Sequence, residues 1–234
     1  MLAVLVSVFL ADRLGRLATG RPTVVPMVVT ATFLATPLFR TGMVNGELLA
    51  VPLVLGGLVA LLHAWTSTGR RALLWGALAG AAAAAAPLVK QNVLDALVVA
   101  GVLVLQGLRS ATRRHTLALA AAVLAGASLA TLGCLVWADA RGTEPSLLWD
   151  AVVTFRGQAA AVIDSSASDS TFQRFQQLVG AGAMSGAPLL LVVMVLRLRR
   201  RAEVAGPPDL RYPALVLVLW ELAAVAGGGS YWLH

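Results

Sequence analysis

Long apolar runs alternate with short polar connections along nearly the whole chain. Most of the runs approach the roughly 20 residues that a helix needs to cross the hydrocarbon core of a bilayer. Because lipid offers no hydrogen-bond partners to the backbone, such runs are expected to be helices. The pattern predicts an all-α polytopic transmembrane helix bundle with about eight membrane segments, at residues 1–11, 22–39, 48–65, 72–89, 93–108, 116–138, 178–196 and 212–229.

Two of these segments are joined by a connection of only three residues. Lys90, Gln91 and Asn92 separate the run 72–89 from the run 93–108. So short a connection predicts a tight helical hairpin over Ala72 to Leu108, with its polar tip at one membrane surface.

Basic residues fall on alternate connections. Thirteen arginines occupy one set and five basic residues the other. Since cytoplasmic loops carry the excess of Lys and Arg, the first set is expected in the cytoplasm, which puts both chain ends, the hairpin tip and segment 139–177 outside. The thirteen are Arg13, Arg16, Arg21, Arg70, Arg71, Arg109, Arg113, Arg114, Arg197, Arg199, Arg200, Arg201 and Arg211; the five are Arg40, Lys90, Arg141, Arg156 and Arg174.

The composition agrees with a multi-pass protein of the cell membrane whose main partner is the lipid bilayer. Only 12% of the residues are charged, whereas soluble domains average about 25%. The net charge of +7 comes from clusters between apolar runs, so no nucleic-acid partner is expected. The single cysteine, Cys134, lies in an apolar run and excludes a disulfide framework within the chain.

The chain is expected to form a single transmembrane domain, residues 1–234, that is truncated at both ends. The run 1–11 is too short to span a bilayer and is followed at once by Asp12 and Arg13, which suits the second half of a longer helix. The one long polar segment, 139–177, is expected to be an external loop. Within it, residues 146–155 have the spacing of a short amphipathic helix, with Trp149 in the headgroup layer.

Small residues mark two pairs of positions where helices are expected to pack closely. Gly76 and Gly80 stand four residues apart, as do Gly182 and Gly186. Small residues at this spacing let the backbones of two membrane helices approach one another. Helix packing is therefore the preferred interpretation of both pairs.

Candidate chemistry gathers at the predicted outer ends. Lys90, the only lysine, stands with Gln91 and Asp95 between nearly pure hydrocarbon arms, and two roles fit it equally: a ligand site, or a lysine that reaches the interface and pairs with Asp95. Glu47 begins an outer helix, where a carboxylate also suits the helix dipole. His63 and His115 lack further ligands at metal spacing, so neither a metal site nor a cofactor is expected.

The chain resembles the polytopic glycosyltransferases that take a sugar from a polyprenyl-phosphate carrier, a superfamily that includes the protein mannosyltransferases and the bacterial aminoarabinose transferases. Short patterns spread over nearly the whole chain carry this resemblance. They are Asp12-Arg13-Leu14-Gly15-Arg16, Asn45-Gly46-Glu47-Leu48-Leu49, the stretch from Gly76 to Gln91, and Gly228-Gly229-Ser230-Tyr231-Trp232-Leu233-His234.

The resemblance implies sugar transfer to an acceptor on the outer face of the membrane. It places the catalytic base in a first external loop, which would lie upstream of Met1. It makes Lys90 a candidate phosphate contact, and Tyr231 and His234 candidate site walls, beside Gln91, Asp95 and Glu47. These residues are expected to enclose one cavity open to the membrane. The alternative is a multi-pass transporter or a non-catalytic membrane scaffold.

Overall fold

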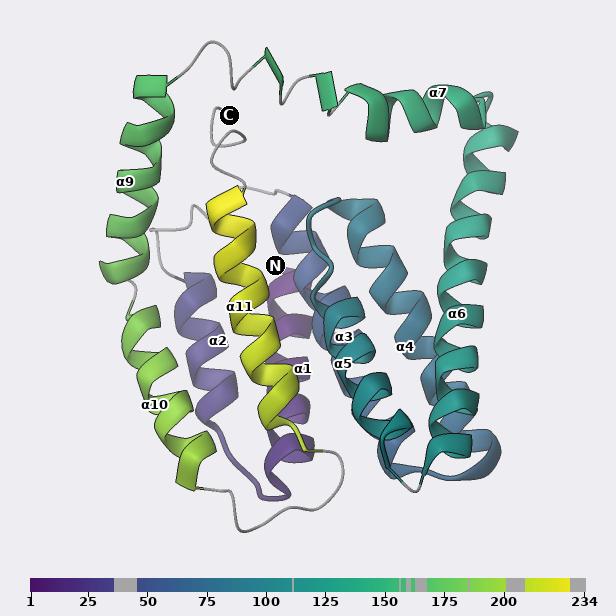
Figure 1. Cartoon of the computed structure of the whole chain (residues 1–234), viewed down its shortest axis with the longest axis vertical. Coiled ribbons are helices and arrows are strands. Elements are labelled where there is room, and N and C mark those ends of the chain that lie inside the picture. The colour runs from purple at the N-terminus through teal and green to yellow at the C-terminus, as the bar shows by residue number, and fades with distance from the viewer. Residues whose placement is uncertain are drawn as a thin grey trace. The chain divides into compact units, whose positions relative to one another are not determined.

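The computed structural model describes residues 1–35, 46–110, 112–155, 157–158, 161–162, 168–184, 186–200 and 209–227. The secondary structure in these ranges is helical, without a strand (Figure 1). The helices are α1 (Leu2–Thr19), α2 (Val25–Ala35), α3 (Gly46–Thr66), α4 (Gly69–Val89), α5 (Asp95–Leu108), α6 (Arg113–Ala140), α7 (Pro145–Trp149), the π-helix η2 (Asp150–Thr154), α9 (Ser168–Met184), α10 (Ala187–Arg200) and α11 (Arg211–Gly227).

Three helices in the described ranges are long and apolar enough to cross a membrane. They are Leu48–Thr66 within α3, all of α4, and all of α6, with mean hydropathies of 2.1, 1.8 and 2.1. Helices α2 and α5 are apolar but shorter. The all-α class expected from the sequence is therefore found, with three of its helices meeting the length and composition of a membrane span.

Helix α1 is longer than the apolar run that predicted it. It continues past residue 11 to Thr19, and the Nε of Arg16 donates to both carboxylate oxygens of Asp12, one turn earlier, at 2.9 and 3.0 Å. The helix ends at Gly20, whose φ of 66° is left-handed. Such a conformation suits glycine because it has no Cβ to clash. Asp12, Arg13 and Arg16, which were expected to follow the predicted segment, therefore lie in the last turns of α1.

The segment expected at 178–196 is two helices, and the preceding loop is partly helical. Helix α9 begins at Ser168, inside the predicted loop 139–177, and ends at Met184. Helix α10 starts at Ala187, directly after Gly186, whose φ is 77°. A residue in the left-handed conformation cannot continue a right-handed helix. Gly186 therefore interrupts the single helix that the apolar residues on both sides of it predict. Residues 145–154 are helical, as α7 and η2.

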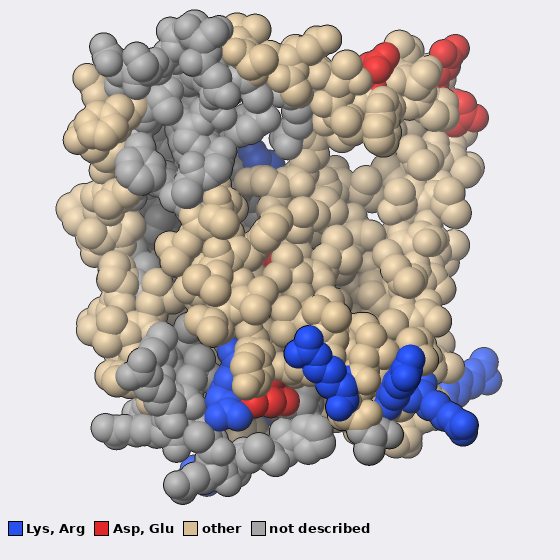
Figure 2. Space-filling model, viewed as in Figure 1, with Lys and Arg blue, Asp and Glu red and all other residues tan. Residues whose placement is uncertain are grey.

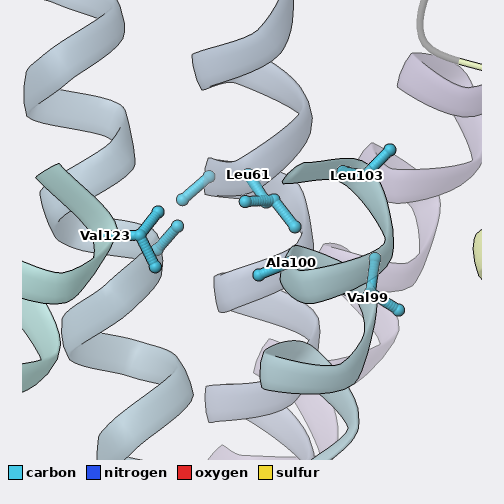
Figure 3. Packing of buried hydrophobic residues seen from close by; sticks show 7 residues of the cluster. Leu61, Val99, Ala100, Leu103 and Val123 are labelled. Atoms are coloured by element: carbon cyan, nitrogen blue, oxygen red, sulfur yellow. The ribbon is translucent and has the colours of Figure 1, made fainter. Parts of the chain in front are cut away.

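The chain divides into two compact units: Met1–Leu132 with Gly206–Val218, and Gly133–Ala205 with Leu219–His234. The first unit has a core that joins four helices (Figure 3). Leu61 of α3 packs with Val99, Ala100 and Leu103 of α5 and with Val123 of α6. Ala79 of α4 belongs to the same cluster. Burial is therefore concentrated on small and aliphatic side chains at helix crossings.

Helix α4 approaches α6 at its glycines, as the sequence predicted for Gly76 and Gly80. A Cβ built on Gly80 would overlap the carbonyl group of Val123, and one on Gly126 would overlap that of Ala77. On Gly76 it would lie 3.2 Å from the Cβ of Ala122. The second pair behaves differently, because a Cβ on Gly182 or Gly186 meets no heavy atom within 4 Å among the described residues. Gly186 serves the backbone turn rather than packing.

The described arginines of the first unit lie at one end of it, which we name the basic end. They lie in the last two turns of α1 or just after it, in the first turn of α4, between α5 and α6 or in the first turn of α6, and at the start of α11. Contacts show that several of these segments meet: Ala64, Ala72 and Leu119 form one buried cluster, and the Nε2 of Gln106 donates to the carbonyl of Asp209 at 3.2 Å. Figure 2 shows the blue side chains along this edge. Its members are Arg13, Arg16, Arg21, Arg70, Arg71, Arg109, Arg113, Arg114 and Arg211.

Candidate functional site

Lys90 and Asp95 lie at the two ends of the connection between α4 and α5, away from the basic end. Lys90 ends α4 with an extended backbone, φ −145° and ψ 109°, and its N–H donates to the carbonyl of Ala86 at 2.9 Å. The N–H of Val93 donates back to the carbonyl of Lys90 at 3.0 Å. Asp95 is the first residue of α5. The polar residues therefore occupy one tight turn whose ends are fixed by two helices.

The start of α3 lies against this turn. A Cβ built on Gly46 would be 3.3 Å from the carbonyl oxygen of Val89 and 3.4 Å from the Cδ of Lys90. The missing side chain at Gly46 thus makes room for the aliphatic stem of Lys90. Glu47 follows in the same first turn of α3. The structure therefore brings Gly46 of one predicted pattern against Lys90 of another, although 44 positions of sequence separate them.

The side chain of Gln91 in this turn has a hydrogen-bond acceptor that is not satisfied. Its side-chain oxygen Oε1 is buried and has no hydrogen-bond partner among the described residues. A buried acceptor without a donor costs free energy, commonly about 1–3 kcal/mol. A hydroxyl or amide N–H from a ligand, or a water molecule, would remove that cost. Lys90, Gln91 and Asp95 are all half-buried, so each is within reach of a bound group. Tyr231 and His234 lie outside the described residues.

A groove elsewhere in the first unit is not lined by these residues. It has a volume of about 870 Å³ and runs between α1 and α2. The charged side chains that reach it are Arg16, which belongs to the basic end, and its ion-pair partner Asp12. The expected cavity at Lys90 and Glu47 stays a prediction, because the side chain of Glu47 and residues 231 and 234 lie outside the described ones. The groove lining is Met1, Val4, Leu5, Val8, Phe9, Asp12, Arg16, Val24, Met27, Ala31, Leu34, Ala35 and Leu48.

Sequence reasoning missed the groove because it ended the first segment at residue 11. The signal was nonetheless present. The lining positions on α1 are Met1, Val4, Leu5, Val8, Phe9, Asp12 and Arg16. Their spacing of three and four residues is that of one helix face. Had the helix been extended to Thr19, Arg16 would have been placed on the same face as the apolar residues before it.

The described residues contain no group of three or more His, Cys, Asp or Glu placed to hold a metal ion. His63 instead stacks on Trp75 of the neighbouring helix, with ring centroids 4.8 Å apart and the planes 23° from parallel. This contact lies among the helices α3 and α4 that form the core. His63 is therefore a packing residue at the crossing of α3 and α4.

Comparison with known proteins finds no family model that matches the chain, and no similar curated protein or solved structure.

Proposed function

We propose that the chain is a multi-pass membrane protein with about eight membrane segments, in which residues 72–108 cross the bilayer as a helical hairpin. Three long apolar helices support this location. So does the surface of α6, where Leu124 and Leu129 are exposed although they lie in the middle of an apolar helix. Exposed apolar surface of this extent suits contact with lipid.

The proposed orientation puts the basic end in the cytoplasm and the turn at Lys90 outside. Helix α4 separates Arg70 from Lys90 by about 30 Å, since each of its 21 residues adds about 1.5 Å. That length equals the hydrocarbon thickness of a bilayer, roughly 30 Å. Arg70 and Lys90 can therefore reach opposite interfaces at the same time.

We further propose that the chain is a glycosyltransferase, or part of one, that uses a polyprenyl-phosphate-linked sugar at its outer end. The ammonium group of Lys90 would bind the donor phosphate as a point charge. The unpaired Oε1 of Gln91 would accept a hydrogen bond from a sugar hydroxyl. Asp95, Glu47, Tyr231 and His234 complete the proposed substrate-binding set. The observation that carries the proposal is this placement of a cation beside a buried, unsatisfied acceptor at one helix turn.

In the proposed reaction the bond between the sugar's anomeric carbon and the phosphate oxygen breaks, and a bond to the acceptor oxygen forms. The departing polyprenyl phosphate carries away the negative charge, which Lys90 would stabilise. The acceptor's proton passes to a carboxylate base.

The alternatives are a transporter and a non-catalytic scaffold. A transporter would place ionisable groups near the bilayer midplane, inside the bundle. The fully buried polar side chains in the described part of the chain are Ser7 and Thr116, and neither carries a charge. The packing of α3, α4 and α6 suits a scaffold equally well as an enzyme. Donor binding at Lys90 therefore separates the enzyme from the scaffold.

The test measures binding of a polyprenyl monophosphate to the purified full chain in nanodiscs. A charge-assisted hydrogen bond contributes about 1.5–3 kcal/mol, so Lys90→Ala should weaken binding about tenfold or more, and Lys90→Arg should weaken it less. Arg70→Ala, which removes a cation from the other end of α4, is the matched control and should leave binding unchanged. Equal binding by the wild-type chain and Lys90→Ala would overturn the donor site and favour the scaffold.

A further inference from the structure

The groove between α1 and α2 is apolar along its length and charged at one end. Its walls are aliphatic and aromatic side chains, among them Leu5, Phe9 and Val24, which are more than half exposed. The two helices touch near the connection that joins them, where a Cβ on Gly15 would overlap the ring of Pro26. Asp12 and Arg16 line the groove within one turn of that contact. The end of the groove that carries Asp12 and Arg16 is therefore the end that lies at the basic end of the unit.

The dimensions of the groove fit one lipid chain. From Met1 to Asp12, α1 rises about 16 Å, which is close to half of the roughly 30 Å hydrocarbon core. The volume of about 870 Å³ lies within the range of small-molecule sites, about 300–1,000 Å³. A helix about 10 Å across would need roughly 1,250 Å³ over the same length. The groove therefore holds an acyl chain of one leaflet more readily than another helix.

The charged end of the groove has spare hydrogen-bond donors. The ion pair between Asp12 and Arg16 uses only the Nε of Arg16, so in the described structure its two terminal NH₂ groups remain for another acceptor. The guanidinium of Arg13 lies over the ring of Phe9, which lines the groove, at 5.3 Å from its centroid. Two cations and one carboxylate leave a net positive charge there. A phosphate suits this arrangement, because guanidinium groups bind it with paired N–H donors.

We propose that the groove between α1 and α2 binds an anionic membrane phospholipid, with one acyl chain along Leu5, Phe9 and Ala31 and the phosphate at Arg16 and Arg13. The inference rests on the proposed membrane location and is independent of the proposed sugar transfer. It concerns the basic end of the first unit, whereas the donor would bind at Lys90. A phospholipid held there would fix the packing of α1 against α2 in the leaflet where the arginines lie.

The test uses the full chain in nanodiscs that contain a photoactivatable phosphatidylglycerol or a photoactivatable phosphatidylcholine. After irradiation, the labelled peptides are identified by mass spectrometry. We expect phosphatidylglycerol to label α1 and α2 at least about threefold more than phosphatidylcholine does. Since a juxtamembrane arginine contributes roughly 1 kcal/mol to anionic-lipid binding, Arg16→Gln should lower this labelling about fivefold. Ala31→Phe should lower it for both lipids, because the ring fills the groove.

Two matched controls separate the groove from general lipid contact. Arg70→Gln removes an exposed arginine from the same end, and Val28→Phe adds a ring to α2 at a position outside the lining; both should label like the wild-type chain. Equal labelling by the two lipids, or labelling unchanged in Arg16→Gln and Ala31→Phe, would overturn the proposal. Cross-links from α1 to a second copy in place of lipid would also overturn it. Resistance to extraction with alkaline carbonate tests the proposed membrane location separately. The donor-binding test at Lys90 tests the proposed sugar transfer separately, so failure of either can be told apart from failure of the lipid site.

Discussion

Gly80 of α4 and Val123 of α6 face one another so closely that their backbones are in contact, and a Cβ on Gly80 would overlap the Val123 carbonyl. At the same crossing, Gly126 of α6 lies equally close to α4, because a Cβ on Gly126 would overlap the carbonyl of Ala77. Neither glycine has a positive φ among the described backbone. Their role is to let two apolar helices approach, which brings more atoms of the two backbones into dispersion contact. Small residues have the same role where helices pack in membranes.

Substituting Gly80 by alanine should destabilise the fold, because the added methyl group must displace the Val123 backbone. Overpacking of this kind costs about 1–3 kcal/mol, and Gly126→Ala should behave alike. The free energy of unfolding can be measured by titration with a denaturing detergent. Gly101→Ala is the control, since a Cβ there meets no heavy atom within 4 Å. It should be neutral or stabilising by up to about 1 kcal/mol. Equal stability of Gly80→Ala and Gly101→Ala would show that the close crossing is absent.

Gly46→Leu should disturb the turn at Lys90 without removing a charge. The new side chain would compete with the Lys90 stem for the space beside Val89, so the ammonium group must move. If Lys90 binds the donor phosphate, affinity for polyprenyl monophosphate should fall several-fold in this variant. Gly101→Leu, the same change at an open position of α5, should retain the wild-type affinity. A wild-type affinity in Gly46→Leu would show that the position of Lys90 does not govern binding.

The membrane orientation can be tested with fusion reporters. Reporters placed after Arg71, Arg114 and Arg201 should be cytoplasmic, and one inserted at Ser166 should be exported, because the arginine-rich connections stay inside. Alkaline phosphatase and green fluorescent protein fusions report the two sides by opposite signals. An exported reporter after Arg114 would contradict the eight-segment arrangement at its centre.

The ion pair at the start of α11 should make stability depend on pH in acid. The side chain of Arg211 hydrogen-bonds the Asp209 carboxylate, with Nη2 to Oδ2 at 2.6 Å, and this lowers the pKa of Asp209 below its ordinary value despite opposing desolvation. A carboxyl whose pKa is lowered by folding stabilises the folded state at pH values above its unfolded pKa, about 3.9. That contribution is lost as the pH falls through the lower folded value.

Asp209→Asn should therefore weaken stability at neutral pH and flatten its decline below about pH 4. The measurement is the thermal unfolding midpoint from pH 7 down to pH 2. Asp139→Asn, which removes an exposed carboxylate near the end of α6, serves as the control. A substitution of an exposed side chain usually changes stability little, so its curve should follow that of the wild-type chain. Parallel curves for Asp209→Asn and the wild-type chain would exclude a role for the Asp209 carboxylate.

The candidate turn at Lys90 could be predicted from the sequence, whereas the contact of Gly46 with this turn could not. A lone lysine and Gln91 between two apolar arms mark a polar turn by local pattern alone. The approach of Gly46 depends on how α3 packs along α4, and nothing in the local sequence records that register. Likewise, the unpaired state of the Gln91 Oε1 emerges only when all the groups around it are in place.

The sequence by itself determined the helical class, the long apolar helices α3, α4 and α6, and the grouping of arginines at alternate connections. These follow from hydrophobicity and charge, which act residue by residue along the chain. Only the tertiary structure decided that α1 continues through Asp12 to Thr19, that Gly186 separates α9 from α10, and that α1 and α2 leave a groove with Arg16 at its end. The continuation of α1 was hidden because an ion pair within one helix turn makes charged residues compatible with an apolar helix. The break and the groove were hidden because backbone conformation and helix separation depend on contacts between distant residues, such as Gly15 with Pro26.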